Sequence, residues 1–414
     1  MKNIYFENEK FGEILSFDYR DGEKEIISLQ QFMQLKNEGK INRVFYNNDQ
    51  YHTVFPQRIY FQITRKCNLK CSYCYMDASI NGEEIPFSDI EKIVDYISEK
   101  GVMEVRLTGG EPTLHSCFTD IVRRLQERNI YVSIGTNGCW TGKVLDYLVQ
   151  VDNMLLIISL DGEEETNQKL RGNNYKIVKE NIKKLREVNK ECKIRVNTVL
   201  TKRNYRNIEK LFLFAKTYHL DYINFIPLKP QVRVKEVKNE MLTAEEYDEA
   251  VNEMVRFRKK YNVKFNTSIL LTDYAAEIMQ DGLYSNKTFC MAGREATNLD
   301  YDFQTKMYRL YGCSYCPVAN VNYDGRLKEY LLAGEFDIES INKMDGIWKN
   351  NDNWFLFRND YKPNLCLKCF RFGHGCIGAC VVQNMDFDYL ERTDNINEEI
   401  KKQLVNMKEN YCKF

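Results

Sequence analysis

Three closely spaced cysteines, Cys67, Cys71 and Cys74, constrain this chain more than any other feature of its sequence. Three thiolates can hold a 4Fe-4S cluster with one iron free of protein ligands, and that iron can bind a substrate or a cofactor. A structural zinc site needs a fourth ligand, but the next candidates, His115 and Cys117, lie far downstream. Polar residues between the cysteines argue against a buried apolar trio. The spacing therefore favours an iron-sulfur cluster over zinc.

A strand is predicted immediately before the cysteines, because residues 58–64 alternate and are rich in β-branched and aromatic side chains. A second predicted strand, residues 104–108, runs into Gly109, Gly110 and Glu111. Glycines let the backbone approach a ligand closely, and a carboxylate beside them can bind an ammonium group. By itself this motif is a common turn, but one strand-helix unit after the cysteines it indicates a binding site.

Strand and helix patterns continue to alternate along the chain. Further strands are predicted at residues 131–135, 154–158, 193–200 and 222–227, and helices at 29–37, 88–99, 117–128, 142–149, 175–188, 204–218 and 243–261. Because this alternation implies a parallel sheet, the predicted fold class is α/β, a partial (β/α)6 TIM barrel rather than a closed barrel of eight units. The candidate binding motifs follow the strands directly, and such sheets place active sites at the carboxyl ends of their strands.

Composition excludes several classes of protein. Lys plus Arg equals Asp plus Glu at 59 each, so no overall field favours nucleic acid or a membrane as a partner. The sequence contains neither a long apolar run typical of a membrane span nor the apolar core of a signal peptide, so a cytoplasmic location is expected. Fourteen cysteines without a secretory signal argue against a disulfide framework, and four histidines leave little for histidine-based catalysis.

Taken in order, these motifs resemble those of the radical SAM superfamily. The resemblance implies that Cys67, Cys71 and Cys74 hold a 4Fe-4S cluster whose open iron binds S-adenosylmethionine (SAM), which is cleaved to a 5′-deoxyadenosyl radical. The other contacts to SAM that it implies are Tyr73 near the adenine, Gly109, Gly110 and Glu111 at the methionyl amine, Thr136 and Asn137 at the ribose, Ser159 and Asp161 in a fourth-strand motif, and Arg171 at the carboxylate. Tyr73 is equally well explained as a packed loop aromatic.

The last third of the chain is also rich in cysteine, with eight cysteines between residues 290 and 412. They are Cys290, Cys313, Cys316, Cys366, Cys369, Cys376, Cys380 and Cys412. Pairs separated by two residues suit chelation, in zinc ribbons as well as in iron-sulfur sites. The remaining three, Cys117, Cys139 and Cys192, are scattered among strands and helices and are predicted to be small core residues.

This second cysteine pattern resembles the SPASM domain, an extension that carries auxiliary clusters on peptide-modifying radical SAM enzymes. The ligand sets that it implies are Cys290, Cys313, Cys316 and Cys380 for auxiliary cluster I, and Cys366, Cys369, Cys376 and Cys412 for auxiliary cluster II. The chain departs from the pattern at Tyr330, where the family has cysteine, and at residues 298–315, an expected insertion that brings Cys313 and Cys316 instead. Tyr330 is interpreted as a packed aromatic, with a catalytic role as the alternative. If one ligand of auxiliary cluster I is missing, its open iron can bind a substrate thiolate or amide.

Four regions are expected along the chain. Residues 1–55 form an N-terminal segment and a candidate short leader-recognition element, residues 56–232 the radical SAM partial barrel, residues 233–288 a bridging region, and residues 289–414 the SPASM domain. No repeat or flexible linker separates these regions, so they are expected to pack together.

The resemblance implies an enzyme, a radical SAM oxidoreductase that takes a hydrogen atom from a ribosomally made peptide and forms a thioether or carbon-carbon crosslink. The alternatives are a sulfatase-type maturase that forms formylglycine, and a peptide-epimerising or peptide-derived cofactor enzyme. Leu331 counts against the sulfatase type, which has Asp after the cysteine that Tyr330 replaces. A non-enzymatic metal-binding scaffold would leave Glu111 and Arg171 unexplained.

The same resemblance implies the cofactors and partners. The expected cofactors are SAM and three 4Fe-4S clusters, one that binds SAM and two that are auxiliary. The expected partners are a peptide or protein substrate and an electron donor such as flavodoxin or ferredoxin, with neither nucleic acid nor a membrane.

Overall fold

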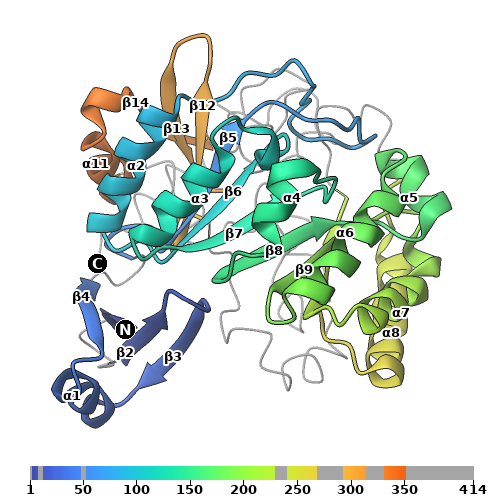
Figure 1. Cartoon of the computed structure of the whole chain (residues 1–414), viewed down its shortest axis with the longest axis horizontal. Helices are drawn as coiled ribbons and strands as arrows, with labels where there is room; N and C mark the ends of the chain where they lie inside the picture. Colours follow the sequence, from blue (N-terminus) through green and yellow to red (C-terminus); the bar gives the residue numbers. More distant parts are fainter. Residues whose placement is uncertain are drawn as a thin grey trace, which may run out of the picture.

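The computed structural model describes residues 2–7, 13–47, 53–228, 240–267, 292–313 and 331–350. These residues form two sheets, one of four strands at the N-terminus and one of ten strands that carries most of the chain. Figure 1 shows the helices that follow the central strands packed along the larger sheet, with the N-terminal sheet as a separate layer below it. None of the described helices is long and apolar enough to cross a membrane.

Six parallel strands form the centre of the larger sheet, in the same order as in the sequence. They are β5 (Arg58–Thr64), β6 (Glu104–Gly109), β7 (Tyr131–Thr136), β8 (Met154–Ser159), β9 (Lys193–Leu200) and β10 (Tyr222–Pro227). The helical segments between them are α2 (Phe87–Glu99), η1 (Pro112–Leu114), α3 (Phe118–Glu127), α4 (Gly142–Leu148), α5 (Glu164–Arg171), α6 (Tyr175–Val188), η2 (Tyr205–Asn207) and α7 (Glu209–Thr217). This arrangement confirms the predicted α/β partial barrel.

Apolar stripes on the helices explain how these layers pack. Helix α2 buries Ile90, Ile93, Val94 and Ile97, which are spaced three and four residues apart and so share one face. The side chains on the outer face of each strand meet such stripes, as Ile194 does on β9, where it is fully buried. The outer face of the sheet is therefore the hydrophobic core of the barrel.

The bridging region adds one more parallel strand. Helix α8 (Ala244–Tyr261), predicted from its amphipathic pattern, begins at Thr243, whose hydroxyl accepts a hydrogen bond from the backbone of Glu246. The chain then forms β11 (Phe265–Thr267), which pairs in parallel with β10. The sheet thus continues beyond the six predicted units at this edge.

The opposite edge of the sheet differs from the sequence-based expectation. Strand β12 (Ala296–Asp302) pairs in parallel with β5, and β13 (Met307–Tyr311) and β14 (Leu332–Phe336) follow in antiparallel order. Residues 298–311, expected as part of an insertion in the SPASM domain, therefore belong largely to the main sheet. The physical reason is burial, because the inserted strands carry large side chains such as Tyr308 and Leu310 that are fully buried. The short segments η5 (Ile338–Ser340) and α11 (Lys343–Lys349) complete this edge.

The N-terminal sheet consists of β1 (Lys2–Glu7), β2 (Glu13–Asp18), β3 (Glu23–Ile27) and β4 (Ile41–Asn47), in the order β3-β2-β1-β4, with the predicted helix α1 (Leu29–Asn37) on one face. Ile4, Ile14 and Ile27 pack under this helix. On the other face, Tyr5 and Phe17 pack against residues of the barrel.

This second face closes the end of the barrel at which the parallel strands begin. Its apolar residues contact Met103, just before β6, and Tyr131, the first residue of β7. The ammonium of Lys193, the first residue of β9, donates to the carbonyl of Asp21 at 2.8 Å, and a Cβ on Gly22 would lie only 2.6 Å from the Tyr131 ring. The other end of the barrel, where the strands finish, carries the predicted motifs.

Candidate active site

The cysteine loop leaves β5 at its carboxyl end. Cys67 is held there by its backbone N–H, which donates to the carbonyl of Ser79 at 2.8 Å. The N–H of Cys74 donates to the carbonyl of Cys71 at 3.2 Å, which turns the chain between these two cysteines. All three side chains are partly exposed. The thiols therefore lie on a loop with both ends fixed, at the edge of the sheet predicted from the sequence.

The three thiols interact electrostatically. Burial, with smaller contributions from the negative charges of Glu111, Cys71 and Cys74, raises the pKa of Cys67 to about 11. Among the described residues, no three Cys, His, Asp or Glu side chains converge closely enough to hold a single metal ion. A 4Fe-4S cluster binds each cysteine at a separate iron corner, so its ligands stand farther apart than those of one ion. Three thiols are one ligand short of a closed zinc site, so this donor set suits a 4Fe-4S cluster with an open iron, and the assignment stays a prediction.

Gly109 and Gly110 bring β6 against the cysteine loop. A Cβ on Gly109, whose φ is +132°, would lie 2.3 Å from the carbonyl oxygen of Thr64, and a Cβ on Gly110 would lie 2.2 Å from that of Lys66. The N–H groups of Gly110 and Glu111 donate to these same carbonyls, at 2.7 and 2.6 Å. The glycines are thus required by a close approach of the chain to itself, whereas the sequence indicated only an approach to a ligand.

Glu111 joins the motifs of three strands. Its side chain is 1% exposed and accepts hydrogen bonds from the hydroxyls of Thr113 and Thr136, at 2.6 and 2.7 Å, and from the N–H of Asn137 at 2.6 Å. Burial raises the pKa of Glu111, and these bonds oppose the rise. The amide of Asn137 donates in turn to Asn68 in the cysteine loop at 2.7 Å. The carboxylate fixes these loops in position, and its contact with a methionyl amine stays a prediction.

Three residues predicted in separate motifs meet at the ends of β8 and α5. Asp161 is fully buried and accepts hydrogen bonds from the Tyr73 hydroxyl and, at 2.8 Å, from the N–H of Val199. Nε of Arg171 lies 2.7 Å from Oδ2 of Asp161 but off the axis of a hydrogen bond, so this contact is ionic. The Arg171 guanidinium carbon lies 5.3 Å from the centre of the Tyr73 ring. Arg171 is therefore already paired, and Tyr73 is a packed aromatic held by a carboxylate.

Sequence reasoning missed two buried asparagines that connect these clusters. Asn167 accepts from the N–H of Asp161 at 3.1 Å and donates to the side chain of Asn174 at 2.6 Å. Asn174 is also 3.4 Å from the carbonyl of Asn137. Only the position of Asn174 directly before a predicted helix marked it in the sequence, because asparagine is favoured at helix starts.

The cysteines expected in the core behave differently from one another. Cys192 is buried, which confirms the prediction, whereas Cys117 and Cys139 are only partly buried. Burial raises the pKa of Cys139 to about 12, and Glu111, Cys67 and Cys71 contribute to this shift by their charges. Cys139 therefore lies close to the cysteine loop, a proximity that its sequence position did not indicate.

The inner face of the barrel sheet is polar and partly open. Asn197 on β9 and Asn224 on β10 are partly exposed, and the Asn224 amide donates to Asn197 at 3.2 Å. Ser159, predicted as a SAM contact, is also partly exposed at the end of β8. In a closed eight-unit barrel this space is filled by packed side chains. Here Asn197, Asn224 and Ser159 keep part of the inner face exposed.

One C-terminal cysteine lies at the other end of this face. Cys313 follows β13, which runs antiparallel to β12, so Cys313 lies on the side where the parallel strands begin. The hydroxyl of Thr297, near the start of β12, donates to the carbonyl of Tyr311 at 2.9 Å. Cys313 and the cysteine loop are therefore at opposite ends of the barrel. The other predicted C-terminal site residues lie outside the described residues, and they are Cys290, Cys316, Tyr330, Cys366, Cys369, Cys376, Cys380 and Cys412.

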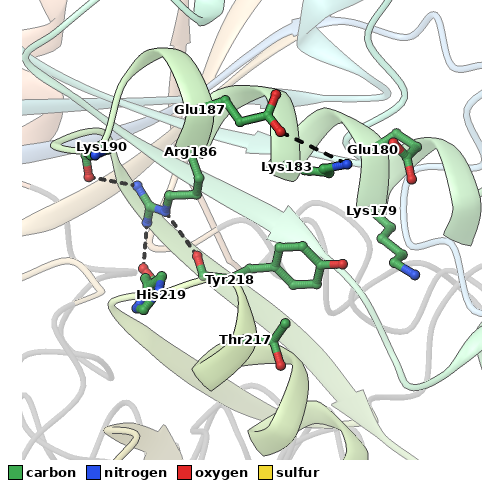
Figure 2. A pocket seen from close by; sticks show the side chains of 9 residues that line it. All are labelled: Lys179, Glu180, Lys183, Arg186, Glu187, Lys190, Thr217, Tyr218 and His219. Atoms are coloured by element: carbon green, nitrogen blue, oxygen red, sulfur yellow. Dashed lines mark hydrogen bonds and ion pairs between the residues drawn. The ribbon is translucent and has the colours of Figure 1, made fainter.

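A hollow of about 510 Å³ on the outer, helical side contains none of the predicted site residues (Figure 2). It opens between α6 and the end of α7 and is lined by Lys179, Glu180, Lys183, Arg186, Glu187, Lys190, Thr217, Tyr218 and His219. The Arg186 guanidinium donates to the carbonyls of Tyr218 and His219, at 3.1 and 2.8 Å, and so fixes the turn after α7. This hollow is explained by the packing of two helices.

The barrel is open, and a loop with three thiols and several polar motifs lie together at the carboxyl edge of its sheet. This arrangement suits the binding of a cofactor. Residues 61–215 match the family model of the radical SAM superfamily. Residues 61–215 are therefore a radical SAM domain, which indicates an enzyme and implies SAM and a 4Fe-4S cluster as cofactors. Cys67, Cys71 and Cys74, on the loop after β5, stay the predicted ligands of that cluster.

Two curated proteins and one solved structure are similar to this chain. A probable GTP 3′,8-cyclase of Methanococcus maripaludis is 25% identical over 293 residues, 68% of this chain and 87% of that protein. The sporulation killing factor maturation protein SkfB of Bacillus subtilis is 29% identical over 170 residues, 40% of this chain and 42% of SkfB. The crystal structure of Streptococcus suis SuiB has a TM-score of 0.64 at 16% identity and covers 95% of this chain and 96% of SuiB, which shows a shared fold.

Proposed function

We propose that this enzyme forms a thioether or carbon-carbon crosslink in a ribosomally made peptide. The observation that carries the proposal is the position of Cys313 at the end of the barrel opposite the cysteine loop, with a polar, partly exposed face between them. Forming one crosslink removes a hydrogen atom, and then a proton and an electron, from the peptide. The reaction therefore needs an electron acceptor as well as SAM, and an auxiliary cluster bound by Cys313 would lie across the substrate from SAM.

The described residues have definite roles in this reaction. When bound, SAM and its cluster supply the radical that abstracts hydrogen. Cys67, Cys71 and Cys74 bind the cluster, and Glu111 keeps the backbone of the second motif beside it. Asp161 orients both Tyr73 and Arg171, which places an aromatic ring and a cation at the rim of the barrel. Ser159, Thr136 and Asn137 complete the SAM contacts that the superfamily implies.

The comparisons support a peptide as the substrate. SkfB is a maturation protein for the sporulation killing factor, and SuiB, which shares the fold of this chain, has been crystallised with its precursor peptide SuiA. The N-terminal sheet gives a place for a leader peptide, because β3 has a strand partner on only one side in the described sheet. Residues 1–55 are therefore proposed as the leader-recognition element. A flavodoxin or ferredoxin in the cytoplasm is the proposed electron donor.

Iron content tests the cofactor part of the proposal. Three 4Fe-4S clusters require about twelve irons per chain after anaerobic reconstitution, and replacing Cys67, Cys71 and Cys74 together with alanine is expected to leave about eight. That variant is expected to cleave no SAM. About four irons per chain, with zinc in the remaining cysteine sites, would reject the SPASM assignment. Undiminished 5′-deoxyadenosine production by the triple variant would reject the assignment of the cysteine loop as the SAM-binding site.

Mass spectrometry tests the reaction. A short peptide encoded beside this gene, incubated with enzyme, SAM and reductant, is expected to lose two hydrogens, about 2 Da, per crosslink. Without peptide, SAM turnover is expected to be slow. An unchanged mass would reject crosslinking and favour epimerisation, and a mass change confined to a cysteine or serine would favour formylglycine formation.

A nucleotide reaction is the second candidate, because the GTP 3′,8-cyclase match extends over 87% of that protein. Incubation with GTP in place of the peptide separates the two. A GTP-derived product would favour this candidate and contradict the peptide proposal.

A further inference from the structure

A layer of arginines crosses the inner face of the barrel below the SAM motifs. Arg58 and Arg106 come from the first half of β5 and β6, and Arg195 comes from the first half of β9, three strands away from β6 (Figure 1). The N-terminal sheet lies beyond this layer, against the first residues of β7 and β9. The layer is therefore the deepest polar part of the inner face.

One carboxylate serves two of these arginines. Nε of Arg58 donates to Oε2 of Glu104 at 2.6 Å, and Nη2 of Arg106 donates to Oε1 at 3.1 Å. The Ser133 hydroxyl also donates to Oε1, at 2.6 Å. Burial alone would raise the pKa of Glu104, but Arg58 and Arg106 outweigh it and lower the pKa below its usual value. Glu104 is therefore ionised and already engaged at both of its oxygens.

Arg195 has no carboxylate as a hydrogen-bond or ion-pair partner among the described residues. Its side chain is 8% exposed, and its one hydrogen bond among the described residues runs from Nη1 to the hydroxyl of Tyr222 at 2.7 Å. Its Nε is buried without an acceptor. Burial lowers the pKa of Arg195 and the charge of Arg106 lowers it further, whereas Tyr222 and the more distant charge of Glu104 oppose the shift without outweighing it. Arg106 and Arg195 therefore repel each other across the inner face. Counted over the part of the chain that the structure describes, this layer holds three cations and one carboxylate, an excess of two positive charges.

A buried cation without a counter-ion is costly, and proteins retain such a group where a ligand supplies the missing charge. We propose that Arg106 and Arg195 bind a carboxylate of the peptide substrate, an inference that rests on the proposed peptide substrate. The free edge of a guanidinium matches a carboxylate with two parallel hydrogen bonds. Tyr60 and Tyr222, which stack on Arg106 and Arg195 at 5.0 and 5.3 Å, flank the site as partly exposed aromatic walls.

The chemistry of the layer favours a carboxylate over a triphosphate. One carboxylate removes half of the excess charge, whereas a triphosphate carries more negative charge than the layer can neutralise. The carboxylate has two possible sources, an acidic side chain or the C-terminus of the peptide. In either case this contact would fix how deeply the peptide enters the barrel, and hence which of its residues faces SAM.

Thermal stability of the full-length, reconstituted protein tests this inference without peptide turnover. The probes are N-acetyl-glutamate α-amide for a side-chain carboxylate, N-acetyl-alanine for a C-terminal carboxylate, neutral N-acetyl-glutamine α-amide, and tripolyphosphate. At a concentration of about ten times its Kd, a carboxylate probe that binds the site is expected to raise the Tm by about 2 °C. The neutral amide is expected to leave the Tm unchanged. The carboxylate probe that raises the Tm shows whether the bound carboxylate of the peptide is an acidic side chain or the C-terminus. A response to tripolyphosphate alone, or equal responses to the charged and neutral amides, would overturn the inference.

Variants assign the response to Arg195. Arg195→Met removes the unpaired cation, so it is expected to raise the Tm of the ligand-free protein and to abolish the response to the carboxylate. Arg195→Lys keeps the charge but loses the paired geometry, and about tenfold weaker binding is expected. The control is Arg123→Met, on the exposed face of α3. A lower Tm in Arg195→Met with an unchanged carboxylate response would show that Arg195 is only structural.

These outcomes are separate from the fate of the proposed reaction. If the peptide is not crosslinked but the Tm response to the carboxylate depends on Arg195, the proposed reaction is rejected and the proposed anion site is supported. If Arg195→Met and Arg123→Met crosslink the peptide equally well and with the same KM, the proposed anion site is rejected and the proposed reaction is supported.

Discussion

Replacing Asp161 with asparagine would test the buried ion pair at the centre of the proposed SAM site. Asp161 is fully buried and contacts Arg171 through both oxygens, at 2.7 and 3.3 Å, while it also holds the Tyr73 hydroxyl. Removing one partner of a buried pair leaves an uncompensated charge, which costs about 3–5 kcal/mol. Asparagine keeps one oxygen acceptor, so a loss near the lower limit of about 3 kcal/mol is expected.

Urea unfolding of the cluster-free protein under reducing conditions measures this loss. Trp140 is a suitable probe, because it is 2% exposed and its indole N–H donates to Thr136 at 2.8 Å, next to the SAM motifs. With a slope of about 3 kcal/mol per molar urea, the expected loss lowers the unfolding midpoint by about 1 M. SAM binding to the reconstituted variant is expected to weaken as well, because Tyr73 and Arg171 lose their common anchor.

Glu165→Gln is the matched control. Glu165 lies on the same helix, α5, and also pairs with a cation, Lys169 at 2.8 Å, but both side chains are exposed. Exposed pairs contribute little because water screens them. The control is therefore expected to leave both the midpoint and SAM binding unchanged. If Asp161→Asn moves the midpoint no more than Glu165→Gln does, the pair does not hold the site together as argued.

The remaining predictions concern the glycine motif and the arginine layer. Gly110→Ala is expected to lower the Tm and the yield of reconstituted cluster, because its Cβ would overlap the carbonyl of Lys66, whereas Gly346→Ala, which meets no atom within 4 Å, is expected to be harmless. Ser133→Ala removes a hydrogen bond to the charged Glu104, so its free energy of unfolding, measured with urea, is expected to be about 1.5–3 kcal/mol lower. An unchanged unfolding midpoint would contradict this. Because the pKa of Glu104 is lowered on folding, its stabilisation is present above the unfolded pKa of about 4.3 and decreases as the pH falls below it. In Glu104→Gln the unfolding midpoint is expected to depend less on pH between about 5 and 3, and an equally steep dependence would assign the effect to other carboxylates.

Local patterns were sufficient to predict the barrel. The bounds of β5, β9 and β10 agree with the predicted strands, because each alternates between a buried outer face and a polar inner face. Helix α6 also agrees with its predicted range, since its apolar residues recur at helical spacing. The predicted helix at residues 204–218 was less accurate, because it begins as the 3-10 turn η2 before α7.

Pairings between distant parts of the chain could not be predicted in the same way. Strand β12 pairs with β5, although more than two hundred residues separate them, and neither sequence indicates the other as a partner. The docking of the N-terminal sheet is a similar case. Its contacts, such as the one between Gly22 and Tyr131, depend on two surfaces that exist only after each sheet has formed.

The sequence by itself indicated the chemistry of this protein, because the spacing of the cysteines and the order of the motifs are properties of the chain that do not depend on its tertiary structure. It placed Cys67, Cys71 and Cys74 on a loop after a strand, and Glu111 after the next one. Tertiary structure decided what each charge faces. Asp161 and Arg171 became partners by packing, and Arg195 was left without a carboxylate partner in the described part of the chain. Burial and distance across the sheet set these energies, and neither can be derived from the order of residues alone.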